Sequence, residues 1–453
     1  MSPSQVTNRF AALSCSLIFL ASPESCLGQA NGTTAEWNAQ QMQEDLAYLR
    51  DTWLPMDKSF NAQSRRNFEA LIGESIAKVD KLSSADFALD VARAVASSGN
   101  GHTDAAVTRF LNRLPYRAWW FSDGLYIVRT HTDFTDLLGA RVERIGKLAP
   151  AEALRRVTPF ISGSDERIRV ISPAFLTSPQ VLRRIGATHD SMKAAITVRL
   201  QNGRQRTLHL SPPDIPDPQA GASWSVLVPG DLNIAGRWPH VLDNVQVRPA
   251  IYREPVNAES EWIGPGGQVL YVRLYERGIP ALEDKLIGIL DKDVVARKPK
   301  YVIIDLRLNT GGDFLKSTLF AQALPRLIPP EGRIFVLIGP VTFSAALVTA
   351  SMLKANGGDK VLFVGERMGD SARFWAEGRY TPLPNSGIPV RASTGFQDWG
   401  TGCRDTDACF WPAAVFGVRN ISLEPDIKVS MSFSDYAAGH DVVLAAALDR
   451  ARN

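Results

Sequence analysis

The sequence has 453 residues, of which 45% are hydrophobic and 21% are charged, an ordinary balance for a globular protein. This length exceeds what one hydrophobic core usually supports, so two or three domains are expected. The 50 basic and 47 acidic side chains are interspersed and leave a net charge of +3. Because there is no run of like charges, the sequence gives no support for binding nucleic acid or an anionic membrane surface.

The first 30 residues are typical of a secretory signal peptide. Arg9 precedes the apolar stretch 10–21, and the small residues Gly28 and Ala30 suit a signal peptidase. A membrane anchor is the alternative, but the stretch is too short to cross about 30 Å of hydrocarbon. We therefore expect an exported protein, periplasmic or extracellular, with no stable membrane span after cleavage of residues 1–30.

The four cysteines agree with export. Two of them, Cys15 and Cys26, fall within the predicted signal, which leaves Cys403 and Cys409 in the mature chain. Two cysteines this close in a Gly/Asp-rich loop of an exported chain predict a disulfide. A zinc site is the competing interpretation, but no other cysteine or histidine lies near them in the sequence.

The region 31–104 predicts a helical layer. Its apolar residues recur at spacings of three and four, and serines stand where they could cap a helix. The region 105–255 changes to alternating β patterns, with turns at Asp123-Gly124 and Asn202-Gly203 that predict hairpins. We interpret 105–255 as a β-rich middle region.

The region 256–453 predicts an α/β core. Buried strand patterns such as YVIIDLRL and IFVLIG alternate with amphipathic helix patterns. Such alternation favours a largely parallel sheet covered on both faces, within a chain that is α+β overall. Functional sites in these folds gather beyond the strand ends, which is where Gly311, Ser344 and Glu366 fall.

Two strand–turn–helix units in this core suggest a serine acyl-transfer site. The turn that carries Ser344 would place its hydroxyl at a helix N-terminus, although serine is also a common helix cap. In the other turn, Gly311 and Gly312 allow close approach to their backbone amides. Together with the amide of Ala345 they are candidates for an oxyanion hole, and the sequence does not choose between the two glycines.

Several segments resemble the S41 family of serine peptidases, the tail-specific or C-terminal processing proteases. The similar motifs are DLRLNTGG, VTFSAA, VGERMGD and LEPDIKV, and weaker similarity runs through GHTDA, WWFSDGLYIV, LLGARVERIG and LPNSGIPV. The resemblance implies a Clp/crotonase-like spiral core and peptide-bond hydrolysis through an acyl-enzyme on Ser344. The segment GARVERIGKLAPAEAL is similar to part of a PDZ-like fold, which would bind a peptide by adding a strand.

One departure from the family decides the expected base. Processing proteases of this family use a lysine after the Gly-Glu motif, but here GDSARF stands there and no lysine lies between Lys360 and Lys428. GHTDA instead resembles the histidine motif of the tricorn-like and retinoid-binding-protein-like branch. That resemblance implies His102 as the general base. Glu366 is the candidate for orienting the imidazole, and a structural ion pair is an equally good interpretation of it.

The expected substrate is a peptide or protein. No cofactor or metal is expected, since no histidine pair at helical spacing, Cys/His cluster or phosphate-binding loop is present. Two alternatives remain. The same fold could bind an apolar ligand without catalysis, or the same nucleophile could act as an esterase or amidase on a non-peptide acyl group. The sequence does not indicate the oligomeric state.

Overall fold

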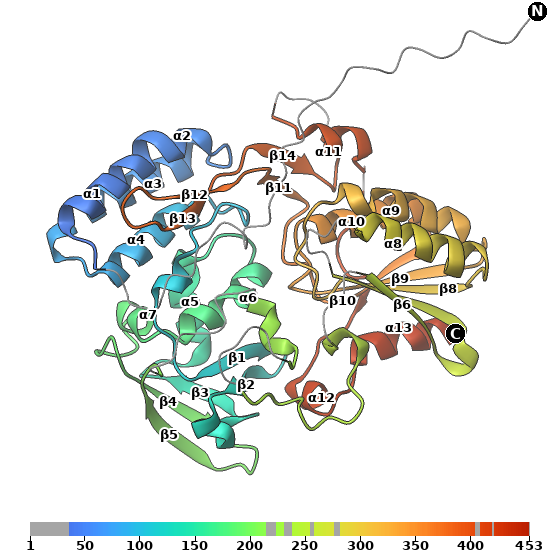
Figure 1. Cartoon of the computed structure of the whole chain (residues 1–453), viewed down its shortest axis with the longest axis horizontal. Coiled ribbons are helices and arrows are strands. Elements are labelled where there is room, and N and C mark those ends of the chain that lie inside the picture. The colour runs from blue at the N-terminus through green and yellow to red at the C-terminus, as the bar shows by residue number, and fades with distance from the viewer. Residues whose placement is uncertain are drawn as a thin grey trace, which may run out of the picture.

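A computed structural model describes residues 36–213, 223–230, 238–253, 258–275, 281–403, 408–418 and 421–452. This part of the chain forms two bodies that lie side by side (Figure 1). The N-terminal half builds one body and the C-terminal half builds the other. The predicted signal peptide lies outside the described residues. None of the helices in the described ranges is long and apolar enough to cross a membrane.

The first body begins with a layer of capped helices, as the periodicity of this region predicts. The side chains of Asn38, Asn61 and Ser83 each accept a backbone N–H at a helix start. The apolar faces bury Trp53 and Phe68, which stack at 5.8 Å between ring centroids. The elements are α1 (Ala39–Tyr48), continued by a π-helical turn (Leu49–Trp53) into α2 (Leu54–Met56), then α3 (Ala62–Ile76) and α4 (Ser84–Ala96).

A five-stranded antiparallel sheet completes the first body. Its order is β1-β2-β3-β4-β5, and both predicted hairpins are confirmed, at Asp123-Gly124 and at Asn202-Gly203. The strands are β1 (Tyr116–Phe121), β2 (Gly124–Thr130), β3 (Arg141–Ile145), β4 (Ala194–Arg199) and β5 (Gln205–Leu210). The likeness of part of this region to a PDZ fold is not confirmed.

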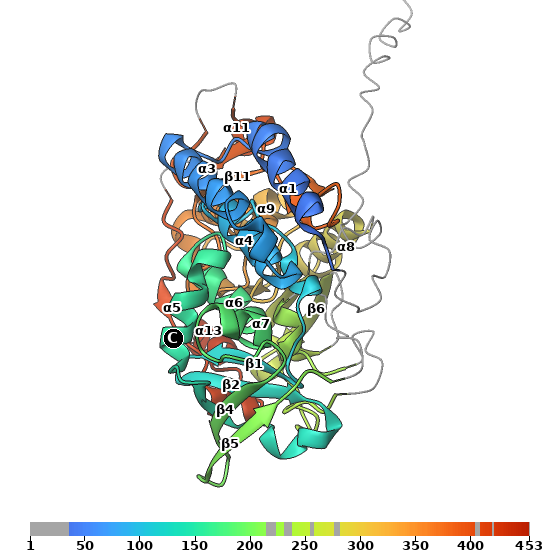
Figure 2. The same ribbon diagram turned by 90° about the vertical axis from the view of Figure 1, so that its left-hand side faces the viewer.

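Three helices interrupt the β-rich middle region. They are α5 (Pro150–Val157), α6 (Asp165–Leu176) and α7 (Pro179–Arg184). Figure 2 shows them between the N-terminal helical layer and the sheet. Ser164 caps α6 and two acidic residues occupy its first turn, which is favourable at a helix N-terminus. One hydrophobic cluster of this body includes residues from Trp37 to Leu210, so the helical layer and the sheet share a core across residue 104. The domain boundaries expected from the sequence remain predictions.

The second body is the expected α/β core. Its sheet has the order β15-β10-β9-β8-β7-β6, and only the edge strand β6 runs antiparallel to its neighbour. The strands are β6 (Ala258–Ile263), β7 (Val269–Leu274), β8 (Tyr301–Asp305), β9 (Arg333–Ile338), β10 (Val361–Gly365) and β15 (Ile427–Lys428). One face packs against α8 (Leu282–Ile289), α9 (Leu315–Leu327) and α10 (Ala345–Gly357), and the other against α13 (Val442–Arg452).

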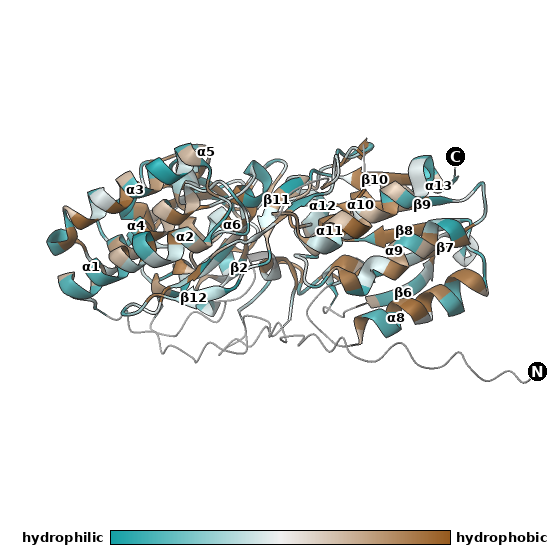
Figure 3. Cartoon of the chain, turned by 90° about the horizontal axis from the view of Figure 1, so that it is seen from above, coloured by the Kyte–Doolittle hydropathy of each residue, from teal (hydrophilic) through white to brown (hydrophobic). Residues whose placement is uncertain are grey.

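Charge and hydropathy in this core follow its layers. Figure 3 shows hydrophilic and hydrophobic residues side by side along α8, as expected for a helix that covers a sheet. At the end of β8 the buried guanidinium of Arg307 bonds Asp305 at 2.6 Å and Asp441 at 2.6 Å. This closed ion-pair cluster fixes the strand end that leads into the Gly311-Gly312 turn.

An arm, residues 373–398, joins the two bodies. It consists of β11 (Arg373–Ala376), β12 (Tyr380–Pro382), β13 (Pro389–Arg391) and β14 (Gly395–Asp398), in which β11 pairs with β14 and β12 with β13. Figure 1 shows β12 and β13 against the N-terminal helices. There the carboxylate of Asp45 accepts the backbone N–H groups of Asn385 at 2.8 Å and Ser386 at 2.9 Å. Two short helices follow the arm, α11 (Trp411–Phe416) and α12 (Phe433–Ala437).

Candidate active site

Ser344 stands at the start of α10 in a strained backbone conformation. Its φ of 55° and ψ of −125° lie in a region that side-chain-bearing residues rarely adopt. The turn before it is fixed by Thr342, whose hydroxyl accepts the N–H of Gly339 at 3.0 Å and donates to the carbonyl of Leu306 at 2.9 Å. The half-buried side chain of Ser344 is therefore presented on a rigid strand-to-helix turn.

The glycine turn packs directly against Ser344. A Cβ on Gly311 would lie 2.6 Å from the Cβ of Ser344 and 2.7 Å from the amide nitrogen of Ala345. The N–H of Gly311 donates to the side chain of Asn309 at 2.8 Å, so this donor is occupied. Gly312 is exposed, and the N–H of Ala345 has no acceptor among the described residues. The free amides beside the serine are thus those of Gly312 and Ala345.

His102 lies in the turn that follows α4. The Asn100 side chain donates to the carbonyl of Trp375 at 3.0 Å and accepts its N–H at 3.1 Å, which fixes this turn to β11. The imidazole is 1% exposed and stacks between Phe343 and Phe374, at 4.5 Å and 4.9 Å between ring centroids. Since Phe343 directly precedes the candidate nucleophile, the histidine turn and the serine turn meet at this ring.

Asp370 also reaches this cluster. Its Oδ2 lies 3.5 Å from Nδ1 of His102, and its side chain is 5% exposed. Burial raises the pKa of the Asp370 carboxyl to about 7, while the guanidinium of Arg167 and the backbone N–H groups of Ser371 and Ser344 partly oppose this rise. The carboxyl of Asp370 therefore lies between the imidazole and the amide of the candidate nucleophile.

The electrostatic state of His102 is that of a neutral base. Burial lowers the pKa of the imidazole well below its usual value, and the cations Arg391 and Arg167 lower it further. Within the described part of the chain neither ring nitrogen has a hydrogen-bond partner. The contact between imidazole and serine hydroxyl that catalysis needs would therefore have to close on substrate binding, as catalytic contacts in unliganded enzymes often do.

Glu366, the acidic residue favoured by sequence, has other neighbours. Burial raises the pKa of its carboxyl, the hydroxyl of Ser430 lowers it by hydrogen bonding, and the remaining charges that act on it are Arg169 and Glu166. No ion pair joins it to His102 among the described residues. The sequence analysis did not single out Asp370, although it noted that GDSARF occupies the place of the family's lysine. Asp370 is the carboxyl-bearing residue of that segment, and its position there was the signal that could have identified it.

The two cysteines of the mature chain form the disulfide that the sequence predicts. A disulfide joins Cys403 to Cys409, with 6.1 Å between their Cα atoms. Within the described residues no group of three His, Cys, Asp or Glu side chains is arranged to hold a metal ion.

Comparison with known proteins identifies the fold. No protein-family model matches the sequence. No curated protein matches it significantly in sequence. Among solved structures, mature CPAF complexed with lactacystin aligns with a TM-score of 0.57 and 15% identity over 91% of this chain and 98% of its own. Mature CPAF alone gives 0.55 and 16% over 91% and 97%.

The photosystem II D1 C-terminal processing protease aligns over 89% of this chain and 98% of its own at 14% identity, with a TM-score of only 0.37. The two CPAF structures, in contrast, share their fold with this chain over nearly the whole of both chains. The chain has the mixed α+β fold of the S41 peptidases.

Proposed function

We propose that this chain is an S41-type serine peptidase that hydrolyses peptide bonds through an acyl-enzyme on Ser344, with His102 as general base. The observation that carries the proposal is that distant segments of the chain bring His102 and Asp370 together beside the backbone amide of Ser344. The carboxyl of Asp370 lies 3.5 Å from Nδ1 of His102. A hydrogen bond from the backbone N–H of Ser344 lowers the pKa of the same carboxyl. Nucleophile, base and orienting acid are the parts of a serine hydrolase site. The shared fold with S41 proteases supports the same reaction.

In the proposed reaction, His102 takes the proton of the Ser344 hydroxyl as its oxygen attacks the substrate carbonyl. The amides of Gly312 and Ala345 stabilise the oxyanion, and each such donor is worth about 3 kcal/mol in the transition state. His102 then gives its proton to the leaving amine, and the same steps with water release the acid. Asp370, in place of Glu366, holds the imidazole and stabilises its cationic form.

We further propose that the enzyme is exported and acts on peptides or proteins. The signal-like residues 1–30 and the disulfide between Cys403 and Cys409 support an oxidising compartment.

Of the two glycines that the sequence left open, Gly312 is favoured as the second oxyanion donor. The N–H of Gly311 is already bonded to the side chain of Asn309, and the turn at Ser344 is rigid.

Labelling with a fluorophosphonate probe and hydrolysis of a peptide library test the assignment together. We expect the probe to modify Ser344, and we expect Ser344→Ala and His102→Gln to lose peptide cleavage while their circular dichroism spectra stay unchanged. Ser434→Ala and His131→Gln change the same residue types away from the site and should keep full activity. Cleavage retained in Ser344→Ala contradicts the proposal. Hydrolysis of aryl esters without any peptide cleavage would assign an esterase instead.

A further inference from the structure

The start of α6 is bonded to two segments of the candidate active site. The hydroxyl of Ser162, just before this helix, donates to the carbonyl of Thr103 at 2.7 Å. Thr103 is the residue that follows the proposed base. The hydroxyl of Ser164, the N-cap of the helix, donates to the carbonyl of Gly369 at 2.8 Å. Gly369 is the residue that precedes the proposed orienting acid, so the start of α6 ties the two segments together.

Arg167, in the first turn of α6, reaches the third segment of the site. Its backbone N–H donates to the hydroxyl of Ser164 at 3.2 Å, which fixes the point from which its side chain extends. Its guanidinium lies 4.0 Å from the ring centroid of Phe343, a favourable cation–π contact. The same ring stacks on the imidazole of His102 at 4.5 Å and directly precedes Ser344. Cation, ring and imidazole therefore form one connected group.

Two glycines pack the stem of Arg167 against the histidine turn. A Cβ on Gly101 would lie 3.1 Å from the Cδ of Arg167 and 3.1 Å from the ring of Phe343. A Cβ on Gly163 would lie 2.7 Å from the same Cδ and 3.1 Å from the Cα of Gly101. The residue that precedes His102 is thus held directly between the stem of Arg167 and the Phe343 ring.

The charge of Arg167 acts on both members of the proposed acid–base pair. Burial raises the pKa of the Asp370 carboxyl to about 7, and Arg167 is the largest influence that opposes this rise. Burial also lowers the pKa of His102, and the cations Arg391 and Arg167 lower it further. One cation therefore favours an ionised Asp370 beside a neutral imidazole. This is the state from which a general base accepts the serine proton.

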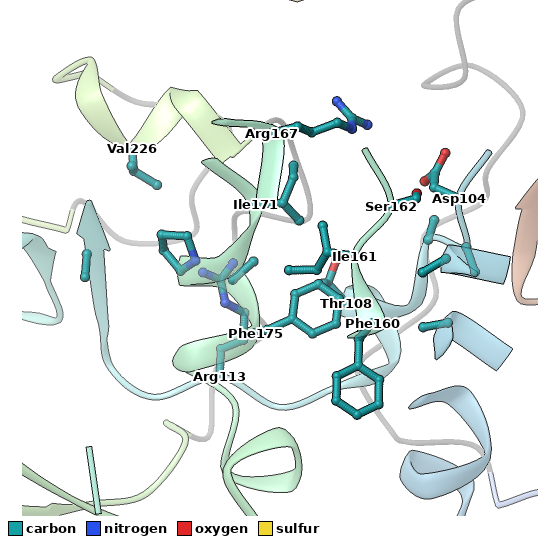
Figure 4. Close-up of a pocket in the computed structure, with 17 residues that line it drawn as sticks. Asp104, Thr108, Arg113, Phe160, Ile161, Ser162, Arg167, Ile171, Phe175 and Val226 are labelled. Atoms are coloured by element: carbon teal, nitrogen blue, oxygen red, sulfur yellow. The ribbon is translucent and has the colours of Figure 1, made fainter. Parts of the chain in front are cut away.

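A second buried carboxyl lies close to this cation. Figure 4 shows the side chain of Arg167 on the side of Asp104. Burial raises the pKa of Asp104, whereas Arg167, Arg391 and the hydroxyl of Tyr380 lower it. The Tyr380 hydroxyl lies 2.9 Å from both carboxyl oxygens of Asp104. Asp104 therefore has a partner of its own, and Asp370 is the carboxyl that lies against the imidazole.

We propose that Arg167 is a positioning residue for the peptidase reaction, and that it holds the Phe343 ring and the Gly101 backbone so that the imidazole of His102 stays beside Asp370. Its charge adds a second effect, because it increases the ionised fraction of Asp370 at neutral pH. The inference rests on the proposed peptidase function and adds a residue to the same site. A residue with only a structural role would leave the ionisation of Asp370 unchanged.

Three variants separate the charge of Arg167 from its packing. Arg167→Met keeps a long side chain without the charge, and Arg167→Lys keeps the charge without the planar guanidinium. Arg169→Met is the matched control on the same helix, since Arg169 donates to the carbonyl of Phe121 at 2.9 Å and its charge acts on Glu366. Circular dichroism checks that each variant is folded, and pH profiles of kcat and KM on a peptide substrate provide the comparison.

The rise of kcat/KM with pH should move in Arg167→Met alone. We expect its midpoint to lie about one pH unit or more above that of the wild type, because the Asp370 carboxyl loses the cation that opposes its protonation. Above this rise, kcat should stay about tenfold or more below that of the wild type, with KM within about twofold. Arg167→Lys should restore the wild-type midpoint. Arg169→Met should keep both the midpoint and kcat.

Carboxyl ¹³C NMR of protein labelled at aspartate measures the same ionisation without turnover. The signal of Asp370 is identified by its loss in Asp370→Asn. A midpoint that rises in Arg167→Met and not in Arg167→Lys supports the proposal. The same shift in a wild-type background that neither cleaves peptides nor reacts with a fluorophosphonate would overturn the reaction and keep the action of Arg167 on Asp370. An unchanged midpoint in Arg167→Met, or equal midpoints in the Met and Lys variants, would overturn the inference about Arg167.

Discussion

At the scale of single residues, the site depends on a carboxyl and an imidazole that are both buried without a hydrogen bond to each other. Burial raises the pKa of Asp370 to about 7 and lowers that of His102, so near neutral pH the imidazole is neutral and about half of the Asp370 carboxyl groups are protonated. Catalysis requires the opposite state, a carboxylate beside an imidazolium, at the moment when the serine proton is transferred. Asp370 is therefore the residue whose replacement is most informative.

Asp370→Asn should lower kcat by between about hundredfold and ten-thousandfold with little change in KM, because an amide neither stabilises the imidazolium nor fixes the tautomer that the base needs. Steady-state kinetics on a peptide substrate measure this. Glu366→Gln is the control, since Glu366 is engaged near Ser430. If Glu366→Gln lost activity and Asp370→Asn kept it, Glu366 and not Asp370 would be the residue that orients the imidazole of His102.

The pH dependence of activity should follow the ionisation of Asp370. Its carboxyl is neutral below about pH 7 and ionised above it, so kcat/KM should rise with pH through about 7 in the wild type. A pH profile of kcat/KM measures this rise in activity. The Asp370→Asn variant should not show the rise. A wild-type profile that stays flat between pH 5 and pH 8 would contradict this role.

The free energy of unfolding should fall as the pH rises, whereas kcat/KM should rise over the same range. The folded protein holds the Asp370 proton more tightly than the unfolded chain does, with a pKa of about 7 against 3.8. Its contribution is present below about pH 4 and is lost as the pH rises through about 7. Asp370→Asn stays neutral throughout, so its stability relative to wild type should increase by up to about 4 kcal/mol over that window. Urea unfolding at several pH values measures the difference, and a constant difference would contradict the raised pKa.

Local sequence predicted one half of the candidate site, and non-local packing determines the other half. Ser344 and Gly311 were recognisable because a buried strand, a glycine or serine turn and a helix follow each other in the chain. Asp370 was not, since its carboxyl meets His102 only after the arm has folded across both bodies. The stacking of His102 between Phe343 and Phe374 has the same origin, because those rings come from different elements.

At the scale of elements, two tight turns set the geometry around the nucleophile. Gly311 has a φ of 95° and packs its Cα against Ser344 and Ala345, so a side chain there is excluded by backbone conformation and by space. The turn at Gly339 has no such contact, since nothing lies within 4 Å of a Cβ built there. The two glycines therefore form a natural pair for a test.

Gly311→Ala should abolish peptide cleavage and labelling of Ser344 by a fluorophosphonate, because the added methyl group displaces the serine turn. It should also lower the free energy of unfolding by about 1–3 kcal/mol from backbone strain. Gly339→Ala should keep both within about twofold of wild type. Labelling at the wild-type rate in Gly311→Ala would show that the glycine turn does not define the site.

The disulfide closes a short loop after β14. Cross-linking a loop of this length should stabilise the fold by about 2 kcal/mol, since it restricts the unfolded chain. The double variant Cys403→Ser and Cys409→Ser should therefore show a lower Tm than wild type in calorimetry. Dithiothreitol should lower the Tm of the wild type and leave that of the double variant unchanged. Equal Tm values for both proteins without reductant would contradict the cross-link.

At the scale of the whole molecule, the arm couples the two bodies through buried carboxylates. Asp57 accepts the hydroxyl of Thr103 at 2.8 Å and the N–H of Ser393 at 2.7 Å, so it joins the residue after His102 to the base of the arm. Asp45 performs the same function at the tip of the arm and has no contact with the histidine turn. The long-range meeting of base and nucleophile should therefore depend on Asp57 and not on Asp45.

Replacing each of these carboxylates separates the stability of the arm from the placement of the base. Asp57→Ala and Asp45→Ala each leave buried N–H donors without an acceptor, so each should lower the free energy of unfolding by about 1–3 kcal/mol. Only Asp57→Ala also removes a hydrogen bond from Thr103, the residue after His102. A shift of His102 by about 1 Å is enough to reduce kcat by about a hundredfold. We therefore expect Asp45→Ala to keep kcat within about twofold of wild type. Equal kcat values for the two variants, measured well below their unfolding temperatures, would mean that the arm does not hold the base in place.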